Sequence, residues 1–399
     1  MKMMKTIIAA ILLCMAFNTT NAQNTSKKEM KLLIEQQFQF AAQQYKILAK
    51  NVAPNVMPKT YHDDSKKVET SDTKWWCSGF FPGTLLYIYE YTGDQEILNE
   101  AKSRLAILEK EKHYKGNHDL GFMMYCSFGN AYRLLKDPSY KTTIDTAAAS
   151  LSTRYRPNAK VIQSWNSSKK WAGPVIIDNM MNLELLNWVS ANGTNQLYKQ
   201  IAISHADQTL KNHFRADYSS YHVVDYNMAD GRVIKRETAQ GAANESAWSR
   251  GQGWALYGYA MMYRFTKDKR YLDQAKNIAQ FILNHPNLPK DKVPYWDFNA
   301  PQIPNEIRDA SSASLIASAL LELGQYSTKK EQTTYVAAAG QMLKSLSTPN
   351  YRAKLGENGG FLLMHSTGSL PGKSEVDVPL TYADYYFLEA LLRYKKWYL

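Results

Sequence analysis

The sequence has only three cysteines among its 399 residues, too few for a disulfide framework. It lacks the paired cysteine spacings and the His-Glu-x-x-His pattern of common zinc sites, and its eight histidines are scattered, so neither a metal nor another cofactor is expected. Its one long apolar run, residues 6–17, is too short to span a bilayer. Stable membrane insertion is therefore not expected.

The N-terminus has the pattern of a secretory signal. Two lysines within residues 1–5 precede the apolar run, and small residues end at Asn21-Ala22. This pattern predicts a signal peptide over 1–22, cleavage after Ala22, and export to a periplasm or to the outside of the cell. Cys14 is followed by Met15 inside the apolar run, which argues against a lipid-anchored cysteine.

The charge is strongly basic. The formal net charge is +12, and loss of Lys2 and Lys5 with the signal peptide reduces it to +10. A basic balance favours anionic partners, but lysine and arginine are dispersed and no nucleic-acid-reading motif is present, so an acidic saccharide is expected rather than nucleic acid. We expect a monomer or a weak homo-oligomer. Cys77 and Cys126 lie in apolar helical contexts and are expected to be free thiols.

Residues 23–399 contain no Pro/Gly/Ser-rich linker and are predicted to form a single domain. Apolar periodicity predicts about twelve helices of two alternating kinds. Amphipathic, charged helices are expected near 28–50, 95–111, 139–153, 196–214, 270–284 and 330–347. Apolar, aromatic helices are expected near 76–92, 120–135, 179–191, 251–266, 310–324 and 382–395. Because apolar helices must be enclosed and amphipathic ones can cover them, the fold class predicted is all-α, an (α/α)6 barrel of six inner and six outer helices.

An internal repeat supports this arrangement. An aromatic-rich helix end, a short polar turn and an amphipathic helix recur at irregular intervals, as at Tyr89–Asp94 and Tyr263–Asp268. Irregular spacing is typical of helical hairpins joined by variable loops. The longest irregular stretch lies between about 214 and 251, where residues 221–226 and 232–236 flank Asp230-Gly231 and predict a β-hairpin over the pocket.

Two aspartates precede inner helices, Asp119 in His118–Phe122 and Asp178 in Val175–Met181. An aspartate at this position is often a helix N-cap, and local sequence alone gives that interpretation about even weight with a catalytic one. In a ring of parallel inner helices, however, all of their N-termini meet at one mouth. Carboxylates, an arginine and aromatics gathered there are typical of a sugar-binding pocket.

Five segments together resemble glycoside hydrolase family 88, the unsaturated glucuronyl hydrolases. They follow one another in the family's order across nearly the whole mature chain: Trp76–Gly83, His118–Phe122, Ile177–Asn182, Trp248–Trp254 and Ala383–Tyr386. The resemblance implies an (α/α)6 barrel that releases a 4,5-unsaturated uronic acid from the non-reducing end of lyase-generated oligosaccharides. The expected substrates are anionic oligosaccharides derived from chondroitin, hyaluronan or heparin.

The resemblance also implies roles for individual residues. Asp178 matches the acid/base that protonates C4 and helps water add at C5, and Asp119 matches a second essential aspartate that supports it. Arg250 or Gln240 is expected to bind the uronate or hydroxyls, and His222 to contact the hydration site. Trp76, Trp165 and Trp254 are expected to form sugar-facing walls.

Each of these residues also has a structural interpretation. Arg250 could pair with Glu245 or Asp309 on the surface, the tryptophans could pack in the core, and His222 could be a half-exposed strand residue. The hydroxyl-rich segment His365–Ser374 precedes the last inner helix, and there Ser366, Ser369 and Lys373 are candidate sulfate ligands. A solvated turn is an equal alternative for this segment.

Three other interpretations stay open on the sequence. A polysaccharide lyase or an ordinary inverting glycosidase could use this fold. An unsaturated rhamnogalacturonyl hydrolase would have the same barrel. A non-catalytic exported sugar-binding protein would need neither aspartate.

Overall fold

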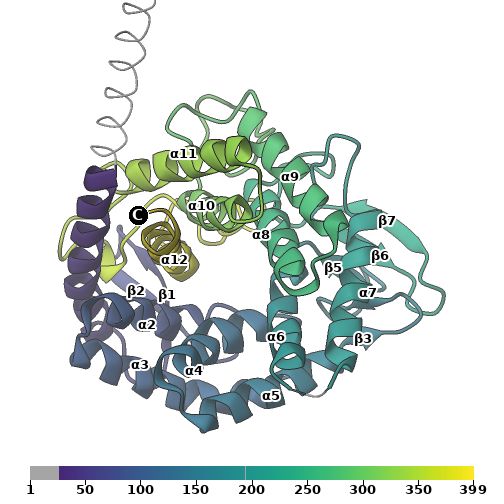
Figure 1. Cartoon of the computed structure of the whole chain (residues 1–399), viewed down its shortest axis with the longest axis horizontal. Coiled ribbons are helices and arrows are strands. Elements are labelled where there is room, and N and C mark those ends of the chain that lie inside the picture. The colour runs from purple at the N-terminus through teal and green to yellow at the C-terminus, as the bar shows by residue number, and fades with distance from the viewer. Residues whose placement is uncertain (1–26, 194) are drawn as a thin grey trace, which may run out of the picture.

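The structure is a computed structural model that describes residues 27–193 and 195–399, so the predicted signal peptide lies outside the described residues. Helices form two concentric rings around a central axis (Figure 1). The inner ring contains α2 (Phe80–Thr92), η2 (Gly121–Gly129) continued by α4 (Asn130–Leu135), α6 (Asn179–Ala191), α8 (Ser249–Thr266), α10 (Ala310–Gly324) and α12 (Thr381–Tyr398). The outer ring contains a helix over 27–50, α3 (Gln95–Leu108), α5 (Pro138–Ser152), α7 (Leu197–Asn212), α9 (Lys269–Asn284) and α11 (Lys329–Leu346).

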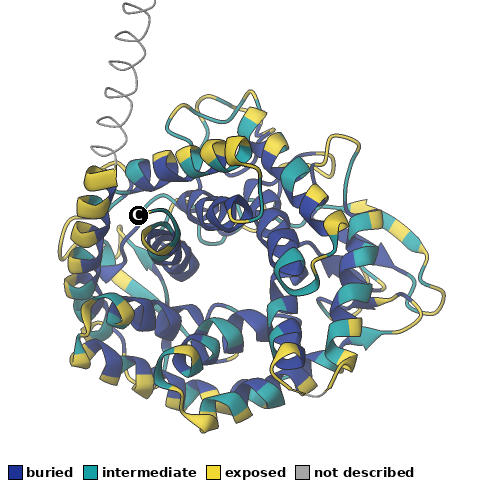
Figure 2. Ribbon diagram, in the orientation of Figure 1, coloured by how far each residue is buried: buried dark blue, intermediate teal, exposed yellow. Residues whose placement is uncertain are grey.

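Packing between neighbours closes the inner ring. Each inner helix contacts the next, and α12 returns to contact α2. Every residue of α10 is buried, whereas the outer helix α9 buries one face and exposes the other, a difference visible around the whole ring in Figure 2. These burial patterns confirm the all-α (α/α)6 barrel and the division into inner and outer helices that hydrophobic periodicity predicts.

The repeat seen in the sequence marks the points where an inner helix ends and an outer helix begins. Three inner helices end on a residue in the left-handed conformation, and the next residue is an aspartate whose side chain accepts a backbone N–H at the start of the outer helix. The three pairs are Gly93 with Asp94, Lys136 with Asp137, and Lys267 with Asp268. Such a C-cap followed at once by an N-cap satisfies exposed backbone groups at both helix ends and reverses the chain within two residues.

One predicted inner helix has an unexpected form. The segment predicted as a continuous helix over 120–135 begins as the π-helix η2 and becomes α-helical only at Asn130. Gly121 lies against α6 so closely that an added Cβ would stand 2.5 Å from the Asn182 Cα. The wider π turn and the missing side chain bring the start of η2 next to the start of α6, where the two aspartates lie.

The β structure is confined to three small antiparallel sheets formed by the connections between helices. The predicted hairpin is confirmed as β6 (Val223–Tyr226) and β7 (Val233–Glu237), and β5 (Pro174–Ile176) pairs with β6 as a third antiparallel strand. Sequence periodicity did not predict β5, because three residues are too few to show alternation. Two further antiparallel pairs are β1 (Met57–His62) with β2 (Lys67–Ser71), and β3 (Tyr155–Arg156) with β4 (Val161–Ile162).

Cys77 and Cys126 are free thiols, as predicted. Among the described residues no helix is both long and apolar enough to cross a membrane.

Candidate active site

Asp119 and Asp178 do not cap the helices that they precede. Asp178 occupies the N-cap position of α6, but its side chain accepts no capping hydrogen bond. Asp309, at the same position before α10, accepts the backbone N–H groups of Ser311 and Ser312. The structure thus separates a structural aspartate from two whose carboxylates are left for another task, a distinction that the sequence left open.

The small sheet places Asp178 beside His222. Ile176 at the end of β5 pairs with Val223 at the start of β6, and the backbone N–H of Ile177 donates to the His222 carbonyl over 3.0 Å. Asp178 follows β5 after a single residue, Ile177. As a result the His222 Nε2 lies 3.7 Å from the Asp178 Oδ2.

The hydrogen bonds of His222 define which ring nitrogen carries the proton. Its Nδ1 accepts the backbone N–H groups of Ala239 and Gln240, each over 3.1 Å. In the neutral ring the proton is therefore on Nε2, the nitrogen that faces Asp178. Within the described residues neither this Nε2 nor the Asp178 Oδ2 has a hydrogen-bond partner, although both are buried. Two unpaired buried polar atoms that face one another are available to water or substrate.

Asp119 has a matching histidine. The His118 Nε2 lies 3.3 Å from the Asp119 Oδ1. The His118 Nδ1 lies 3.3 Å from the Asn182 Nδ2, and the Asn182 Oδ1 accepts the Phe122 backbone N–H over 2.9 Å. This amide orientation makes Asn182 a donor to Nδ1, so His118 also presents an N–H at Nε2 to its aspartate.

Burial controls the protonation of these four groups. It raises the pKa of Asp178 to about 7, with the Arg250 cation opposing the rise. It also raises the pKa of Asp119 to about 8, and there the Asp178 charge adds to the effect while the Arg154 cation opposes it. Burial lowers the pKa of His118 and of His222 to about 3. Near neutral pH both histidines are therefore neutral, and the carboxyl pair retains at least part of its protons.

Each aspartate side chain nevertheless keeps 11% of its surface exposed, so the carboxyl groups are within reach of a ligand. A carboxyl group with a pKa near 7 can donate a proton and take one back at neutral pH. The arrangement is suited to general acid/base chemistry.

Arg250 is buried at the start of α8 and is not a surface residue. It pairs with Asp309 over 3.0 Å and donates to the carbonyl oxygens of Thr367 and Gly368 over 2.5 and 2.6 Å. Of its five N–H donors, the one on Nε and one on Nη2 have no hydrogen-bond partner within the described residues. The pairing with Asp309 weighed in the sequence is present, but inside the protein, and it holds the segment after His365 against the mouth. A contact of Arg250 with a uronate stays a prediction.

The three predicted tryptophan walls have different environments. Trp76 is partly buried and its ring lies 4.9 Å from the Tyr382 ring. Trp165 is also partly exposed, with its ring edge-on to His222 at 6.2 Å. Trp254 is fully buried, and its ring lies 5.0 Å from Phe122. Trp254 therefore lies beneath the aspartates. Within the described residues its indole N–H makes no hydrogen bond, but it acts on Asp178 and lowers the pKa of that carboxyl.

The candidate sulfate ligands lie along one irregular hairpin. Ser366 is fully buried at its base and pairs with Val378, while the Ser369 Oγ accepts the Gly372 backbone N–H and Lys373 is exposed at the turn. Within the described part of the chain, no hydrogen bond connects the side chains of these three residues to one another. Gln240 is partly buried, and its backbone positions His222. The ligand roles of all four residues stay predictions.

Three residues gain a role from the structure that sequence reasoning did not assign. The Trp248 ring lies between His222 at 4.5 Å and the Arg250 guanidinium at 4.5 Å. The His118 Nε2 lies beside Asp119, and Asn182 holds the other nitrogen of the His118 ring, as described above. All three stood inside the conspicuous segments, but only the fold shows that Trp248 contacts His222 and that Asn182 contacts His118, the histidines beside the two aspartates.

Comparison with known proteins places this site in a family. The model of Glycosyl Hydrolase Family 88 matches residues 48–284. The unsaturated glucuronyl hydrolase of Formosa agariphila is 44% identical over 380 residues, which cover 94% of this chain and 92% of the relative. The unsaturated chondroitin disaccharide hydrolase of Streptococcus pyogenes serotype M1 is 33% identical, with 82% and 83% covered.

A solved structure of an unsaturated glucuronyl hydrolase is also similar to this chain. The crystal structure of an unsaturated glucuronyl hydrolase specific for heparin superposes with a TM-score of 0.88 at 46% identity, covering 91% of this chain and 97% of that one. The chain belongs to glycoside hydrolase family 88. The relatives that it matches over most of their length are unsaturated glucuronyl hydrolases and unsaturated chondroitin disaccharide hydrolases.

Proposed function

We propose that the chain releases the 4,5-unsaturated uronic acid from the non-reducing end of glycosaminoglycan oligosaccharides produced by lyases. The observation that carries this proposal is the pair of buried, uncapped aspartates, each facing the Nε2–H of a neutral histidine. A binding protein would have no need to keep two carboxyl groups desolvated, because an unpaired buried carboxylate is costly. The family relationship supports the same assignment.

The proposed reaction is hydration of the C4–C5 vinyl ether. Asp178 donates its proton to C4, and positive charge develops at C5 and the ring oxygen. Water adds to C5 and gives its proton back to Asp178. The resulting hemiketal opens to a ketone at C5, and the freed C1 hemiacetal expels the neighbouring sugar. Because C1 is not the atom attacked, the separation of the two carboxylates does not report on anomeric stereochemistry here.

The surrounding residues are proposed to assist this step. The N–H groups of His222 and His118 can position the water or the substrate hydroxyls without carrying charge. The Arg250 cation favours the ionised form of Asp178, and so keeps the pKa of that carboxyl from rising beyond the neutral range. Asp119 supports Asp178 by holding a second proton or negative charge nearby.

Within this class, we propose that heparin-derived disaccharides are preferred over chondroitin-derived ones. The support is the identity of 46% to the heparin-specific structure, against 33% to the chondroitin disaccharide hydrolase, both over most of the chain. Lys373, exposed at the turn of its hairpin, supplies a cation for a sulfate. If Lys373→Ala leaves the rates on sulfated substrates unchanged, this role of Lys373 is wrong.

A panel of unsaturated disaccharides from heparin, chondroitin, hyaluronan and pectin tests the proposal. Loss of the double-bond absorbance should occur with the glycosaminoglycan members and be fastest with heparin. Turnover of the pectin member alone would instead indicate the rhamnogalacturonyl activity. Absence of turnover with every member would favour a sugar-binding protein.

We also propose that the protein is exported after cleavage at Ala22, on the basis of the charge and apolar pattern of residues 1–22. Cell fractionation with N-terminal sequencing of the mature protein tests this. Full-length protein in the cytoplasm would contradict it.

A further inference from the structure

A second cavity lies at the opposite end of the barrel from the aspartates. It has a volume of about 670 Å³, within the range of roughly 300–1,000 Å³ typical of small-molecule sites. It is lined by residues of α2, η2, α4, α6, α8 and α12, among them Tyr91, Trp188, Arg264 and Trp397 near C-terminal helix ends, whereas Asp119 and Asp178 precede the N-terminal ends of inner helices. Arg250 at one end of α8 and Arg264 at the other are fourteen residues apart, which corresponds to ~20 Å along a helix.

Aromatic rings fill the barrel between the two ends. Trp254 lies 5.0 Å from Phe122 and 5.5 Å from Tyr386, and Tyr386 lies 6.0 Å from Phe80. Below this layer, Glu389 accepts hydrogen bonds from Tyr87, Tyr257 and Ser318. The second cavity therefore has its own floor and is not an extension of the mouth that holds the aspartates.

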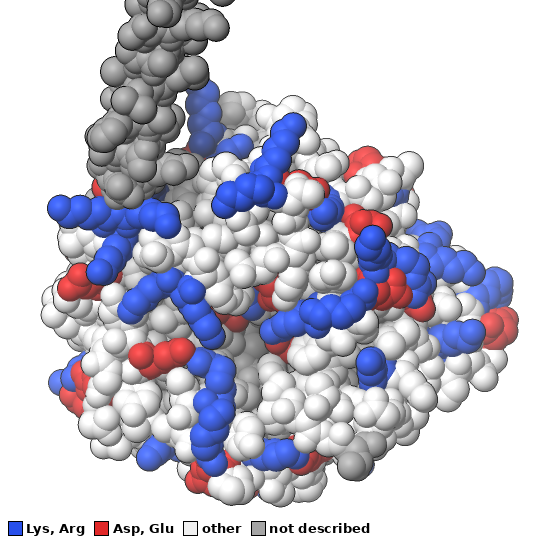
Figure 3. Space-filling model, in the orientation of Figure 1, with Lys and Arg blue, Asp and Glu red and all other residues white. Residues whose placement is uncertain are grey.

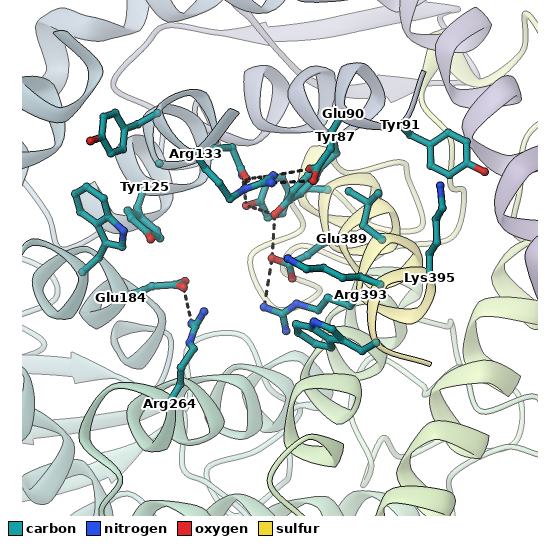
Figure 4. Close-up of a pocket in the computed structure, with 18 of the residues that line it drawn as sticks. Tyr87, Glu90, Tyr91, Tyr125, Arg133, Glu184, Arg264, Glu389, Arg393 and Lys395 are labelled. Atoms are coloured by element: carbon teal, nitrogen blue, oxygen red, sulfur yellow. Dashed lines mark hydrogen bonds and ion pairs between the residues drawn. The ribbon is translucent and has the colours of Figure 1, made fainter. Parts of the chain in front are cut away.

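Acidic groups in the wall of this cavity are already neutralised. Arg133 donates to both carboxylate oxygens of Glu90, over 2.8 and 2.5 Å, and Arg264 pairs with Glu184 over 2.5 Å. Arg393 lies 3.5 Å from Glu389 (Figure 4). The buried carboxylate of Glu322 also pairs with Arg264 and with Arg393, each over 3.1 Å, so four carboxylates share three guanidinium groups and leave one formal negative charge behind the wall.

Three lysines lining the same cavity have no carboxylate partner within the described residues: Lys136, Lys395 and Lys396. The Lys395 Nζ stands 4.0 Å over the Tyr91 ring (Figure 4), and the Lys136 Nζ stands 5.6 Å from the Tyr132 ring. Figure 3 shows a central hollow with basic side chains around it. Lysines near helix C-termini also offset the helix dipole, but that effect does not require them to surround a cavity.

Aromatic surface completes the lining. The Trp188 ring lies 5.9 Å from Tyr125 and 5.6 Å from Tyr132, and Trp397 lies on the α12 side. Trp188 is only partly buried. Aromatic faces stack on sugar rings, and cations without a partner attract carboxylate and sulfate groups.

We propose that this cavity is a second, non-catalytic binding site for anionic oligosaccharides. It would hold a saturated segment of a uronate-containing or sulfated chain, because recognition by lysines and aromatic rings does not depend on the C4–C5 double bond. The site binds independently of the reaction at the aspartates.

The experiment is calorimetric titration of the enzyme with a saturated chondroitin sulfate hexasaccharide, which has no double bond to react. We expect binding that weakens as salt is raised. The double variant Lys395→Gln/Lys396→Gln should weaken it about tenfold, the order expected for two lost charge contacts. Trp188→Ala should weaken binding as well. A matched control, Lys211→Gln/Lys290→Gln, removes the same charge from exposed positions outside the cavity and should have little effect.

Two further measurements locate the bound chain. Turnover of an unsaturated disaccharide should be unchanged in the Lys395→Gln/Lys396→Gln variant. In Asp178→Asn saturated with that disaccharide, the hexasaccharide should still bind. Displacement of the hexasaccharide by the disaccharide, equal weakening by the control variant, equal binding of neutral maltohexaose, or no binding at millimolar concentration would each overturn the proposal.

Discussion

The Nε2 of His222 lies 3.7 Å from the Oδ2 of Asp178, and within the described residues neither atom has a hydrogen-bond partner. The other ring nitrogen of His222 accepts two backbone N–H groups, so the ring presents a fixed, neutral N–H to the carboxyl group. His118 and Asp119 repeat the arrangement. The proposed chemistry rests on these two histidine–aspartate relationships.

Replacement of His222 tests whether its N–H matters. His222→Phe should lower kcat by about 100-fold, within the range for a positioned proton-handling group. His222→Gln retains a donor and should lose less, and circular dichroism checks that both variants are folded. Equal losses in the two folded variants would contradict a role for the N–H.

The value of kcat/KM should fall on the alkaline side of the pH profile. The proposed proton donor Asp178 has a pKa raised to about 7, so activity should decline as the pH rises through that value. On the acid side no loss from His222 or His118 is expected down to pH ~5, because burial lowers the pKa of each to about 3. A rate that rises through pH 8 would contradict Asp178 as the acid.

Replacement of Asp178 should change the pH dependence of the free energy of unfolding in a definite direction. A carboxyl whose pKa is raised on folding contributes stability that is complete below its unfolded pKa and is lost as the pH rises through the folded value. Asp178→Asn has no such loss. Its free energy of unfolding relative to wild type should therefore rise by roughly 2–3 kcal/mol between pH 5 and pH 8.5, measured by urea denaturation. A constant difference would mean that the pKa of Asp178 is not raised.

Gly121 is expected to be needed for the approach of η2 to α6. A Cβ at this position would stand 2.5 Å from the Asn182 Cα, so Gly121→Ala must displace one of the two segments. We expect a loss of about 1–3 kcal/mol in stability and a lower kcat, because Asp119 and Asp178 flank this contact. Gly340→Ala in α11 is the control, since the nearest atom to a Cβ there lies 3.5 Å away in the side chain of Tyr394. Unfolding curves and kcat are measured for both variants. Equal effects of the two substitutions would contradict a special need for glycine at position 121.

The sequence predicts much of this fold because each part of the pattern is local. Alternation of apolar and amphipathic helices needs only periodicity, and the Asp94 and Asp268 caps follow from composition at the turns. Strand β5 and the π-helical start of η2 are not predictable this way. They depend on pairing with β6 and on packing against Asn182, which are contacts between distant parts of the chain.

The candidate site also combines features that the sequence predicts with features that depend on contacts between distant parts of the chain. The positions of Asp119 and Asp178 before inner helices are readable in the sequence, but their freedom from capping is not. Asp309 has the same local context and does cap its helix. The burial of Arg250 and its hold on Thr367 and Gly368 likewise require the closed ring, which brings α8 next to a loop more than a hundred residues later.

The most direct test of the account follows double-bond absorbance and release of the reducing sugar together, using an unsaturated heparin or chondroitin disaccharide. Hydration of the vinyl ether predicts that one double bond disappears for each sugar released, and that Asp178→Asn reduces both rates at least 100-fold. Release of sugar with the absorbance unchanged would indicate ordinary glycosidic hydrolysis. That result would contradict the proposed role of Asp178.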